Sequence, residues 1–204
     1  LSLKTLIDSF KTGNVIKNGI PISIVGEPNT GKSTLLNTLL NDERAIVSSI
    51  AGTTRDTIED KININGVICR FIDTAGIRKT QDEIESIGIE RTFKKMEESE
   101  IVLFLIDSSK LNSKKINYYK NYLNEIELKF PNTQLITIFN KIDLKSDITF
   151  SELDEFNPIK LSAKAKINID LLKNKIIDYI NKLTIQVDSS VISNSRHYDL
   201  LNKT

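Results

Sequence analysis

One loop constrains this chain more than any other feature, the segment Gly26-Glu27-Pro28-Asn29-Thr30-Gly31-Lys32-Ser33. It follows the apolar run Ile22 to Val25 and precedes Thr34 to Leu40, a segment whose composition is typical of a helix. Glycines at both ends of such a loop let the backbone turn tightly, so that its N–H groups point inward at phosphate oxygens. The strand, loop and helix in this order predict a phosphate-binding loop.

The residues of this loop and of the first helical turn are expected to hold nucleotide phosphates. Lys32 would reach the β- and γ-phosphates, and Ser33 would place its hydroxyl on Mg²⁺. The N-terminus of the helix adds a partial positive charge at the same place. The predicted phosphate-binding set is Asn29, Thr30, Gly31, Lys32, Ser33 and Thr34.

The rest of the chain alternates between strand and helix patterns. Asn65-Gly66 lies between two apolar runs and is a strong hairpin signal. The expected strands cover residues 22–25, 61–64, 67–72, 101–106, 134–139 and 156–161, and the expected helices cover 34–41, 88–97, 113–129 and 169–183. This alternation predicts an α/β fold with a six-stranded, mostly parallel sheet, one antiparallel strand and helices on both faces. Residues 20–184 would form this domain, between a lead-in helical segment (1–19) and a linker with the start of another helix (185–204).

Two polar motifs after the phosphate loop are expected to respond to the γ-phosphate. Asp73, at the end of an expected strand, would hold Mg²⁺ through water, and the Gly76 N–H would meet the γ-phosphate. Thr53 and Thr54 lie in a polar loop long enough to move, and the Thr54 hydroxyl would be another Mg²⁺ ligand. Ordering of such loops by γ-phosphate and Mg²⁺ is the usual switch mechanism.

The motif Asn140-Lys141-Ile142-Asp143 indicates which base is bound. Guanine presents an N1–H and an exocyclic amine side by side, and these two donors suit a bidentate carboxylate such as Asp143. The Ala163 N–H, within Ser162-Ala163-Lys164, would donate to the guanine carbonyl. Because the phosphate loop and the motifs at 73–76, 140–143 and 162–164 each follow an expected strand, where open α/β sheets bind ligands, the predicted ligand is GTP or GDP with Mg²⁺.

Two groups that assist hydrolysis in Ras-type GTPases are missing from these motifs. The glutamine that orients the attacking water after Asp-x-x-Gly is replaced by Ile77, so another polar group must do this. The candidates downstream are Arg78, Gln81, Asp82, Glu83 and Glu85. The phosphate loop also offers no arginine, so another group must meet the negative charge that develops in the transition state.

Composition narrows the function classes only slightly. The chain has 28 Lys plus Arg and 27 Asp plus Glu, so a net charge of +1 gives no global attraction to nucleic acid or anionic membrane. No apolar run approaches the length of a membrane span. The stretch from Lys110 to Asn124 is interpreted as a solvated helix face rather than a nucleic-acid patch.

The single cysteine, Cys69, favours a reducing, cytoplasmic location and is interpreted as a buried strand thiol.

Residue by residue, these motifs resemble those of the G domain of the MnmE (TrmE) family of tRNA-modification GTPases. This resemblance implies that the fold is a Ras-like P-loop G domain. The segments that carry the resemblance are Pro28 to Ser33, Ala45-Ile46-Val47, Gly52-Thr53-Thr54-Arg55-Asp56, Asp73-Thr74-Ala75-Gly76-Ile77-Arg78 and Glu85 to Glu90. The likeness covers nearly the whole chain. The flanking folate-binding domain and the C-terminal Cys-x-Gly-Lys motif of that family are missing, so we expect an excised G domain.

The resemblance implies roles for particular residues. The asparagine matching Asn29 helps to coordinate a K⁺ ion beside the phosphates, and backbone carbonyls near Ser49 and Ile50 cap that ion. The glutamate matching Glu85 positions the catalytic water, and the arginine matching Arg78 belongs to the mobile second switch.

The resemblance also implies partners. G domains of this family form homodimers across their nucleotide faces with K⁺ and a triphosphate-like ligand. The full protein works with the FAD protein MnmG on the wobble uridine of certain tRNAs. The alternative is a ribosome-assembly GTPase of the Era or Der type, acting as an RNA-binding switch. Der usually shows Pro-Gly-Val-Thr-Arg-Asp and Asp-Thr-Gly-Gly, and this chain has neither.

Overall fold

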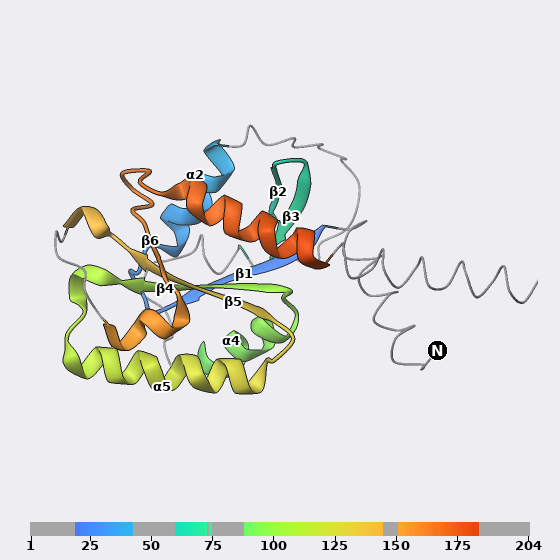
Figure 1. The fold of residues 1–204 in the computed structure, drawn as a ribbon. Coiled ribbons are helices and arrows are strands. Elements are labelled where there is room, and N and C mark those ends of the chain that lie inside the picture. Colours follow the sequence, from blue (N-terminus) through green and yellow to red (C-terminus); the bar gives the residue numbers. More distant parts are fainter. Residues whose placement is uncertain (1–18, 43–59, 73, 75–87, 145–150, 184–204) are drawn as a thin grey trace, which may run out of the picture.

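A single twisted sheet organises the molecule, with helices on both of its faces (Figure 1). The computed structural model describes residues 19–42, 60–72, 74, 88–144 and 151–183. The strands are β1 (Ile20–Gly26), β2 (Asp60–Ile64), β3 (Val67–Phe71), β4 (Ile101–Asp107), β5 (Gln134–Asn140) and β6 (Ile159–Lys160). The helices are α2 (Lys32–Asp42), α4 (Gly88–Glu97), α5 (Ser113–Lys129), a helix over 169–183, and the 3₁₀ turns η1 (Ser108–Lys110), η2 (Ile142–Leu144) and η3 (Ser151–Phe156).

The strand order is β2-β3-β1-β4-β5-β6, and β2 alone runs antiparallel to its neighbour. This confirms the predicted six-stranded, mostly parallel sheet. The β2–β3 hairpin turns at Asn65 and Gly66, both with positive φ (49° and 90°), as the right-handed twist of a two-residue hairpin requires. The Asn63 side-chain oxygen accepts a hydrogen bond from the Gly66 N–H at 2.7 Å and closes the turn.

Two apolar cores lie on opposite faces of the sheet. One is covered by α2 and the 169–183 helix through residues such as Leu36, Leu39 and Ile176, and the other by α4 and α5 through residues such as Met96 and Leu123. All seven residues of β4 are buried, as expected for a central strand covered on both faces. None of the helices in the described ranges is long and apolar enough to cross a membrane.

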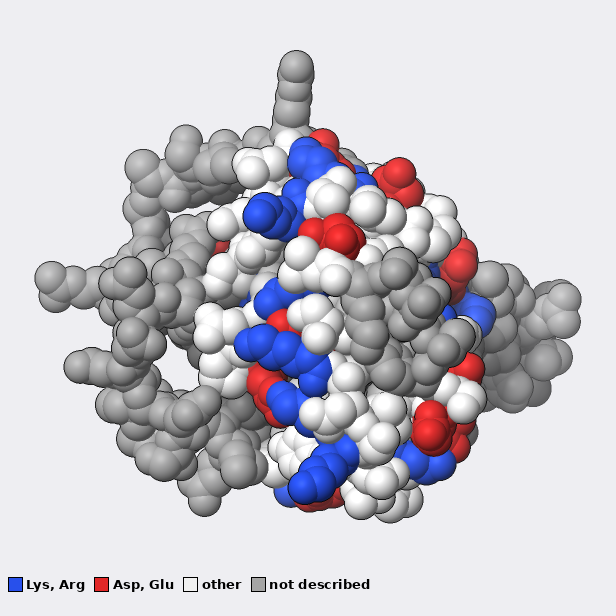
Figure 2. Space-filling model, turned by 90° about the vertical axis from the view of Figure 1, so that its left-hand side faces the viewer, with Lys and Arg blue, Asp and Glu red and all other residues white. Residues whose placement is uncertain are grey.

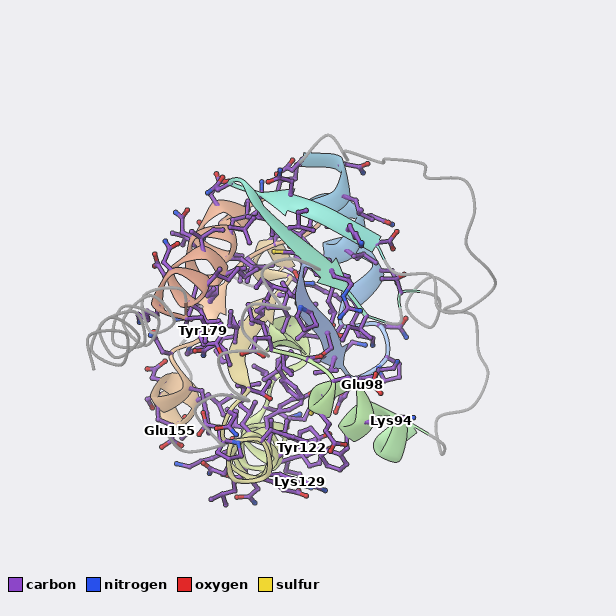
Figure 3. All side chains as sticks on the ribbon, turned by 90° about the vertical axis from the view of Figure 1, so that its right-hand side faces the viewer. Lys94, Glu98, Tyr122, Lys129, Glu155 and Tyr179 are labelled. Atoms are coloured by element: carbon purple, nitrogen blue, oxygen red, sulfur yellow. The ribbon has the colours of Figure 1, made fainter. Side chains whose placement is uncertain are left out.

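The face of α5 turned toward α4 carries a cluster of aromatic rings. Phe93 of α4 contacts Tyr122 and Phe130, and the Lys129 ammonium lies 3.8 Å from the centre of the Phe93 ring. Figure 3 shows Tyr122 and Lys129 on α5. Cation–π contacts of this kind add to the apolar packing between helices. The predicted helix over 113–129 is confirmed, and its positions outside this packing are mostly exposed.

The last strand is shorter than its sequence pattern predicts. We expected residues 156–161 to be extended, but Ser151–Phe156 form η3 and only Ile159–Lys160 pair with β5. Phe156 packs against the α4–α5 core, and Asn157 takes a positive φ of 45°, which no strand residue adopts. Phe156 is therefore apolar because it packs against the core, and not because it belongs to a strand.

The buried thiol prediction is confirmed. Cys69 lies in the middle of β3, fully buried, and burial raises the pKa of its thiol to about 12. A thiol with so high a pKa is protonated at neutral pH and unreactive. The lead-in segment 1–18 and the tail 184–204 lie outside the described residues, so the proposed domain limits stay predictions.

Two buried threonines offer a matched test of how hydrogen bonding contributes to stability. Thr137 of β5 is 1% exposed, and its hydroxyl finds no hydrogen-bond partner among the described residues. Thr38 of α2 is also buried, but its hydroxyl donates to the Ala163 carbonyl at 2.9 Å. We expect Thr137→Val to raise the free energy of unfolding by about 1 kcal/mol, because an unpaired buried hydroxyl is replaced by a methyl group of the same shape.

Thr38→Val should lower the free energy of unfolding by about 1 kcal/mol, because a hydrogen bond is lost and a buried carbonyl loses its donor. Urea denaturation of both variants measures the two changes, and equal shifts in one direction would contradict this account. Both substitutions keep a β-branched side chain, so the difference isolates the hydrogen bond.

Candidate functional site

The phosphate loop leaves β1 at Gly26 and enters α2 at Lys32. Gly26 and Gly31 both have positive φ (146° and 100°), and a Cβ atom on either would collide, with the Leu105 carbonyl oxygen and the Asn140 side-chain nitrogen respectively. The Thr30 hydroxyl donates to the Glu27 carbonyl at 2.9 Å, and the Leu35 N–H donates to the Gly31 carbonyl as α2 begins. The loop therefore turns tightly, as the sequence predicts, and the structure places it against the ends of β4 and β5.

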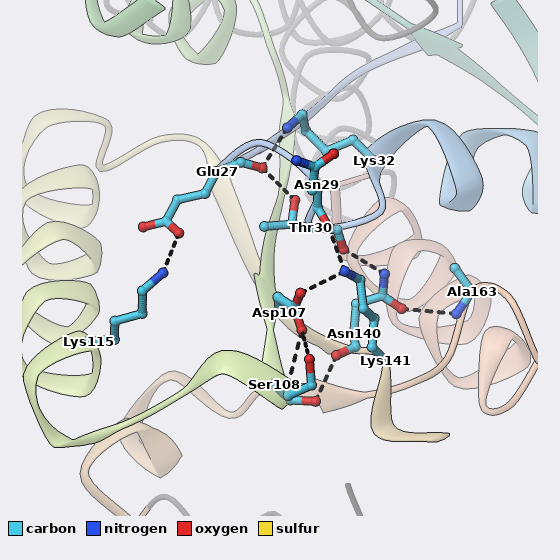
Figure 4. Close-up of polar contacts among 11 residues, drawn as sticks. Glu27, Asn29, Thr30, Lys32, Asp107, Ser108, Lys115, Asn140, Lys141 and Ala163 are labelled. Atoms are coloured by element: carbon cyan, nitrogen blue, oxygen red, sulfur yellow. Dashed lines mark hydrogen bonds and ion pairs between the residues drawn. The ribbon is translucent and has the colours of Figure 1, made fainter. Parts of the chain in front are cut away.

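Lys32 folds back over this loop (Figure 4). Its ammonium donates to the carbonyls of Gly26 at 2.9 Å and Glu27 at 2.8 Å. Burial, with a smaller contribution from the charge of Lys95 on α4, lowers the pKa of Lys32 below its ordinary value. An ammonium held over the loop in a partly desolvated setting is well placed to pair with a phosphate. Ser33 and Thr34 lie beside it in the first turn of α2.

Asn140, the last residue of β5, joins the three predicted motifs. It is 2% exposed, its amide nitrogen donates to the Thr30 carbonyl at 2.8 Å, and its amide oxygen accepts from the Ala163 N–H at 3.0 Å. Its backbone carbonyl accepts from the Ser108 hydroxyl at 2.7 Å. Asn140 therefore fixes the phosphate loop beside residues 162–164.

Lys141 makes a second connection to the phosphate loop. It has a positive φ of 66°, and its ammonium donates both to the Asn29 carbonyl and to Oδ2 of Asp107, each at 2.6 Å (Figure 4). Asp107 also accepts from the N–H and hydroxyl of Ser109. Burial opposes ionisation of Asp107, yet the bonds from Lys141 and Ser109 hold the pKa of its carboxyl below the usual range.

The predicted base-reading residues lie at the same edge of the sheet. Asp143, in η2, is exposed, and the Ile142 N–H donates to the Leu161 carbonyl, which ties η2 to the end of β6. Ser162 is buried and its hydroxyl accepts from the Ala165 N–H, while Lys164 is exposed. Because the Ala163 N–H donates to Asn140, the predicted bond from Ala163 to the guanine carbonyl would have to be shared with this contact or exchanged for it.

Three residues of the site were missed by sequence reasoning. Asp107 and Ser108 follow the buried strand β4, and the rule that ligands bind at strand ends could have drawn attention to them. Lys115 of α5 forms an ion pair with Glu27 of the phosphate loop at 2.7 Å, and no sequence signal indicates it, since 88 positions separate the two. Eight predicted site residues lie outside the described residues, namely Ser49, Ile50, Thr53, Thr54, Asp73, Gly76, Arg78 and Glu85.

The surface over the carboxyl ends of the strands is rich in cationic side chains. Figure 2 shows lysine and arginine side chains in a band down the middle of this face, with acidic side chains among them. A local band of this kind suits an anionic ligand such as a nucleotide, although the whole chain carries a net charge of only +1.

A phosphate loop after the first strand, tied to an Asn-Lys-x-Asp motif at the end of β5 in a sheet of this order, is the arrangement of a P-loop GTPase. The chain belongs to the family described as "50S ribosome-binding GTPase", whose model matches residues 21–141. It is similar to curated proteins named tRNA modification GTPase MnmE. That of Flavobacterium psychrophilum is 53% identical and that of Bacteroides thetaiotaomicron 46%, each over 98% of this chain and 44% of the relative.

These matches confirm the resemblance to the MnmE G domain, and the chain spans a little under half the length of those relatives. Solved structures support the fold. A GTP-binding protein of Sulfolobus solfataricus in complex with GDP aligns with a TM-score of 0.55 at 21% identity, covering 89% of this chain and 58% of that one. A putative nucleolar GTP-binding protein of Plasmodium falciparum aligns with a TM-score of 0.56 at 20% identity, covering 91% and 95%.

Proposed function

We propose that this chain is the K⁺-stimulated, GTP-hydrolysing G domain of an enzyme that modifies tRNA. The observation that carries the guanine-nucleotide part is the convergence of three motifs on one edge of the sheet, where Asn140 bonds to both Thr30 and Ala163. The tRNA part rests on the similarity to MnmE over 98% of the chain. In this proposal Lys32 binds the phosphates and Asp143 reads guanine.

Two described residues of the phosphate loop carry side-chain oxygens that suit the metal ions of this proposal. Hydroxyl and amide oxygens are the hard ligands that such cations prefer, and the phosphate loop offers both, in Ser33 and in the exposed side chain of Asn29. Mg²⁺ would be held by Ser33, Thr54 and Asp73, and K⁺ by Asn29 with carbonyls near Ser49 and Ile50. When bound, the ions neutralise charge that develops on the β- and γ-phosphate oxygens.

The remaining roles concern hydrolysis and assembly. Glu85 would orient the attacking water, which a glutamine does in Ras-type GTPases and which Ile77 at that position cannot do. Arg78 would move with the second switch. We further propose that two G domains associate across their nucleotide faces when GTP and K⁺ are bound. In the full protein an MnmG-like FAD protein would be the partner and tRNA the substrate, in the cytoplasm.

A second candidate is a ribosome-assembly GTPase, which the description of the matching family, "50S ribosome-binding GTPase", favours. The guanine-nucleotide site fits both candidate functions and favours neither. Association of the full-length protein with ribosomal subunits rather than with tRNA and an MnmG-like protein would support the second candidate. The names of the relatives and the motif Asp73-Thr74-Ala75-Gly76 favour the first.

Replacing K⁺ by Na⁺ tests the cation part of the proposal. A trans arginine finger at the β–γ bridge is worth ~10³–10⁵ in rate, and a K⁺ ion in that position should supply part of this. We expect GTP hydrolysis in KCl to exceed that in matched NaCl by more than about tenfold, because a site sized for K⁺ holds Na⁺ poorly. Phosphate release under single-turnover conditions measures both rates.

Asn29→Ala should make hydrolysis insensitive to the choice of salt, whereas Asn37→Ala, at an exposed position on α2, should respond like the unaltered chain. Size-exclusion chromatography with GDP and aluminium fluoride should show association in KCl only. Equal hydrolysis rates in KCl and NaCl would exclude the cation mechanism.

A further inference from the structure

The carboxylate of Asp107 occupies a central position between the two loops of the nucleotide site. Asp107 is the last residue of β4, and the β4–β5 register places it opposite Asn140. Its side chain is 7% exposed, and both of its oxygens accept hydrogen bonds, Oδ2 from Lys141 and Oδ1 from Ser109. A buried carboxylate so fully paired has one orientation, so it can serve as a fixed anchor.

The group that it anchors reaches the phosphate loop. The Lys141 ammonium, held by Asp107, also donates to the Asn29 carbonyl at 2.6 Å. Asn29 and Lys141 both adopt positive φ angles, 61° and 66°, a region that asparagine tolerates but that is unfavourable for lysine. Such conformations persist only where surrounding contacts enforce them, and the lysine bridge joins the two residues directly.

We propose that Asp107 is a positioning residue for guanine-nucleotide binding. Acting through Lys141, it sets the Asn29 end of the phosphate loop at a fixed distance from the loop that carries Asp143. A nucleotide must contact both loops at once, so holding them in the binding geometry in advance lowers the ordering cost of binding. This inference rests on the proposed function, since it assumes that the phosphates and guanine bind at these loops.

The competing explanation is that Asp107 is only structural, because the same carboxylate caps η1 through Ser109. The two explanations differ in their dependence on Lys141. If Asp107 acts through Lys141, removing the lysine should also remove the effect of changing the aspartate. If Asp107 only stabilises η1, the two changes should act independently.

The test is a double-mutant cycle on the full chain, with the dissociation constant for Mg²⁺-GDP as the readout. Asp107→Asn keeps the shape but loses the charge, and it turns an amide NH₂, which can only donate, toward either Lys141 or Ser109. We expect Asp107→Asn and Lys141→Met each to weaken GDP binding about tenfold, because either change breaks the charge-assisted link from Asp107 to the phosphate loop. The double variant should bind GDP no more than about twofold more weakly than either single variant.

Ser109→Ala is the matched control, because it removes a hydroxyl donor to Asp107 but leaves the Lys141 bridge in place. It should bind GDP within about twofold of the unaltered chain. Circular dichroism shows that each variant is folded, and Asp107→Ser replaces Asp107→Asn in the cycle if the latter does not fold. The proposal would be overturned if the two single losses of GDP affinity multiplied in the double variant. It would also be overturned if Ser109→Ala lost as much GDP affinity as Asp107→Asn. Absence of GDP binding by the unaltered chain would instead overturn the proposed function, and this inference with it.

Discussion

Asp143→Asn is expected to weaken GTP binding by 2–4 kcal/mol, on the order of 30- to 1000-fold in the dissociation constant. The carboxylate accepts from the N1–H and the exocyclic amine of guanine together, and an amide can accept only one of these bonds while turning a donor toward the other. Asp143 lies on η2, exposed at the carboxyl edge of the sheet, where its carboxylate can meet a base.

The same substitution should improve binding of xanthosine triphosphate, whose second carbonyl accepts from the new amide. Competition between the two nucleotides for the same variant measures the switch. Asp154→Asn is the control, because Asp154 is also exposed in a 3₁₀ turn, but this turn, η3, contacts α5 and carries none of the predicted base contacts. A variant that still binds GTP as tightly as the unaltered chain would show that Asp143 does not read guanine.

Glu85→Ala is expected to reduce hydrolysis by two orders of magnitude or more while the affinity for GTP changes little. Positioned acid–base groups are worth about 10²–10⁴ in rate, and an interaction made mainly in the transition state lowers turnover without affecting ground-state binding. Another group must orient the attacking water, because Ile77 occupies the position at which Ras-type enzymes carry their glutamine.

Single-turnover phosphate release and a separate binding titration measure the two quantities for Glu85→Ala. Glu83→Ala provides a matched control, with the same chemical change two residues earlier in the chain. Unchanged turnover in Glu85→Ala would return the role to Gln81, Asp82 or Glu83. A loss of affinity equal to the loss of rate would assign Glu85 to ground-state binding instead.

Much of this fold could be predicted because its signals are local. Period-two and period-3.6 patterns, glycines at the ends of the phosphate loop and the Asn65-Gly66 turn each depend on neighbouring residues. The helices at 88–97 and 113–129 therefore lie where the sequence places them. The last strand was the exception, because an apolar run also arises where a turn packs Phe156 into the core.

The class of site follows from the sequence alone. Lys32, Asn140 and Asp143 are defined by motifs in which residue type and spacing match a guanine nucleotide, and strand-end positions imply that they meet. Sequence could not determine how they are held. The strand order β1-β4-β5 brings Asn140 to Thr30 across 110 positions and Lys141 to Asp107 across 34, and Lys115 reaches Glu27 across 88.

Such contacts depend on which strands become neighbours and on where each strand ends, and both are settled by packing the two cores on a common sheet. From the sequence alone, a carboxylate that becomes buried, such as that of Asp107, cannot be distinguished from one that stays exposed to solvent. Only the tertiary structure buries it, pairs it with Lys141, and so makes it part of the site.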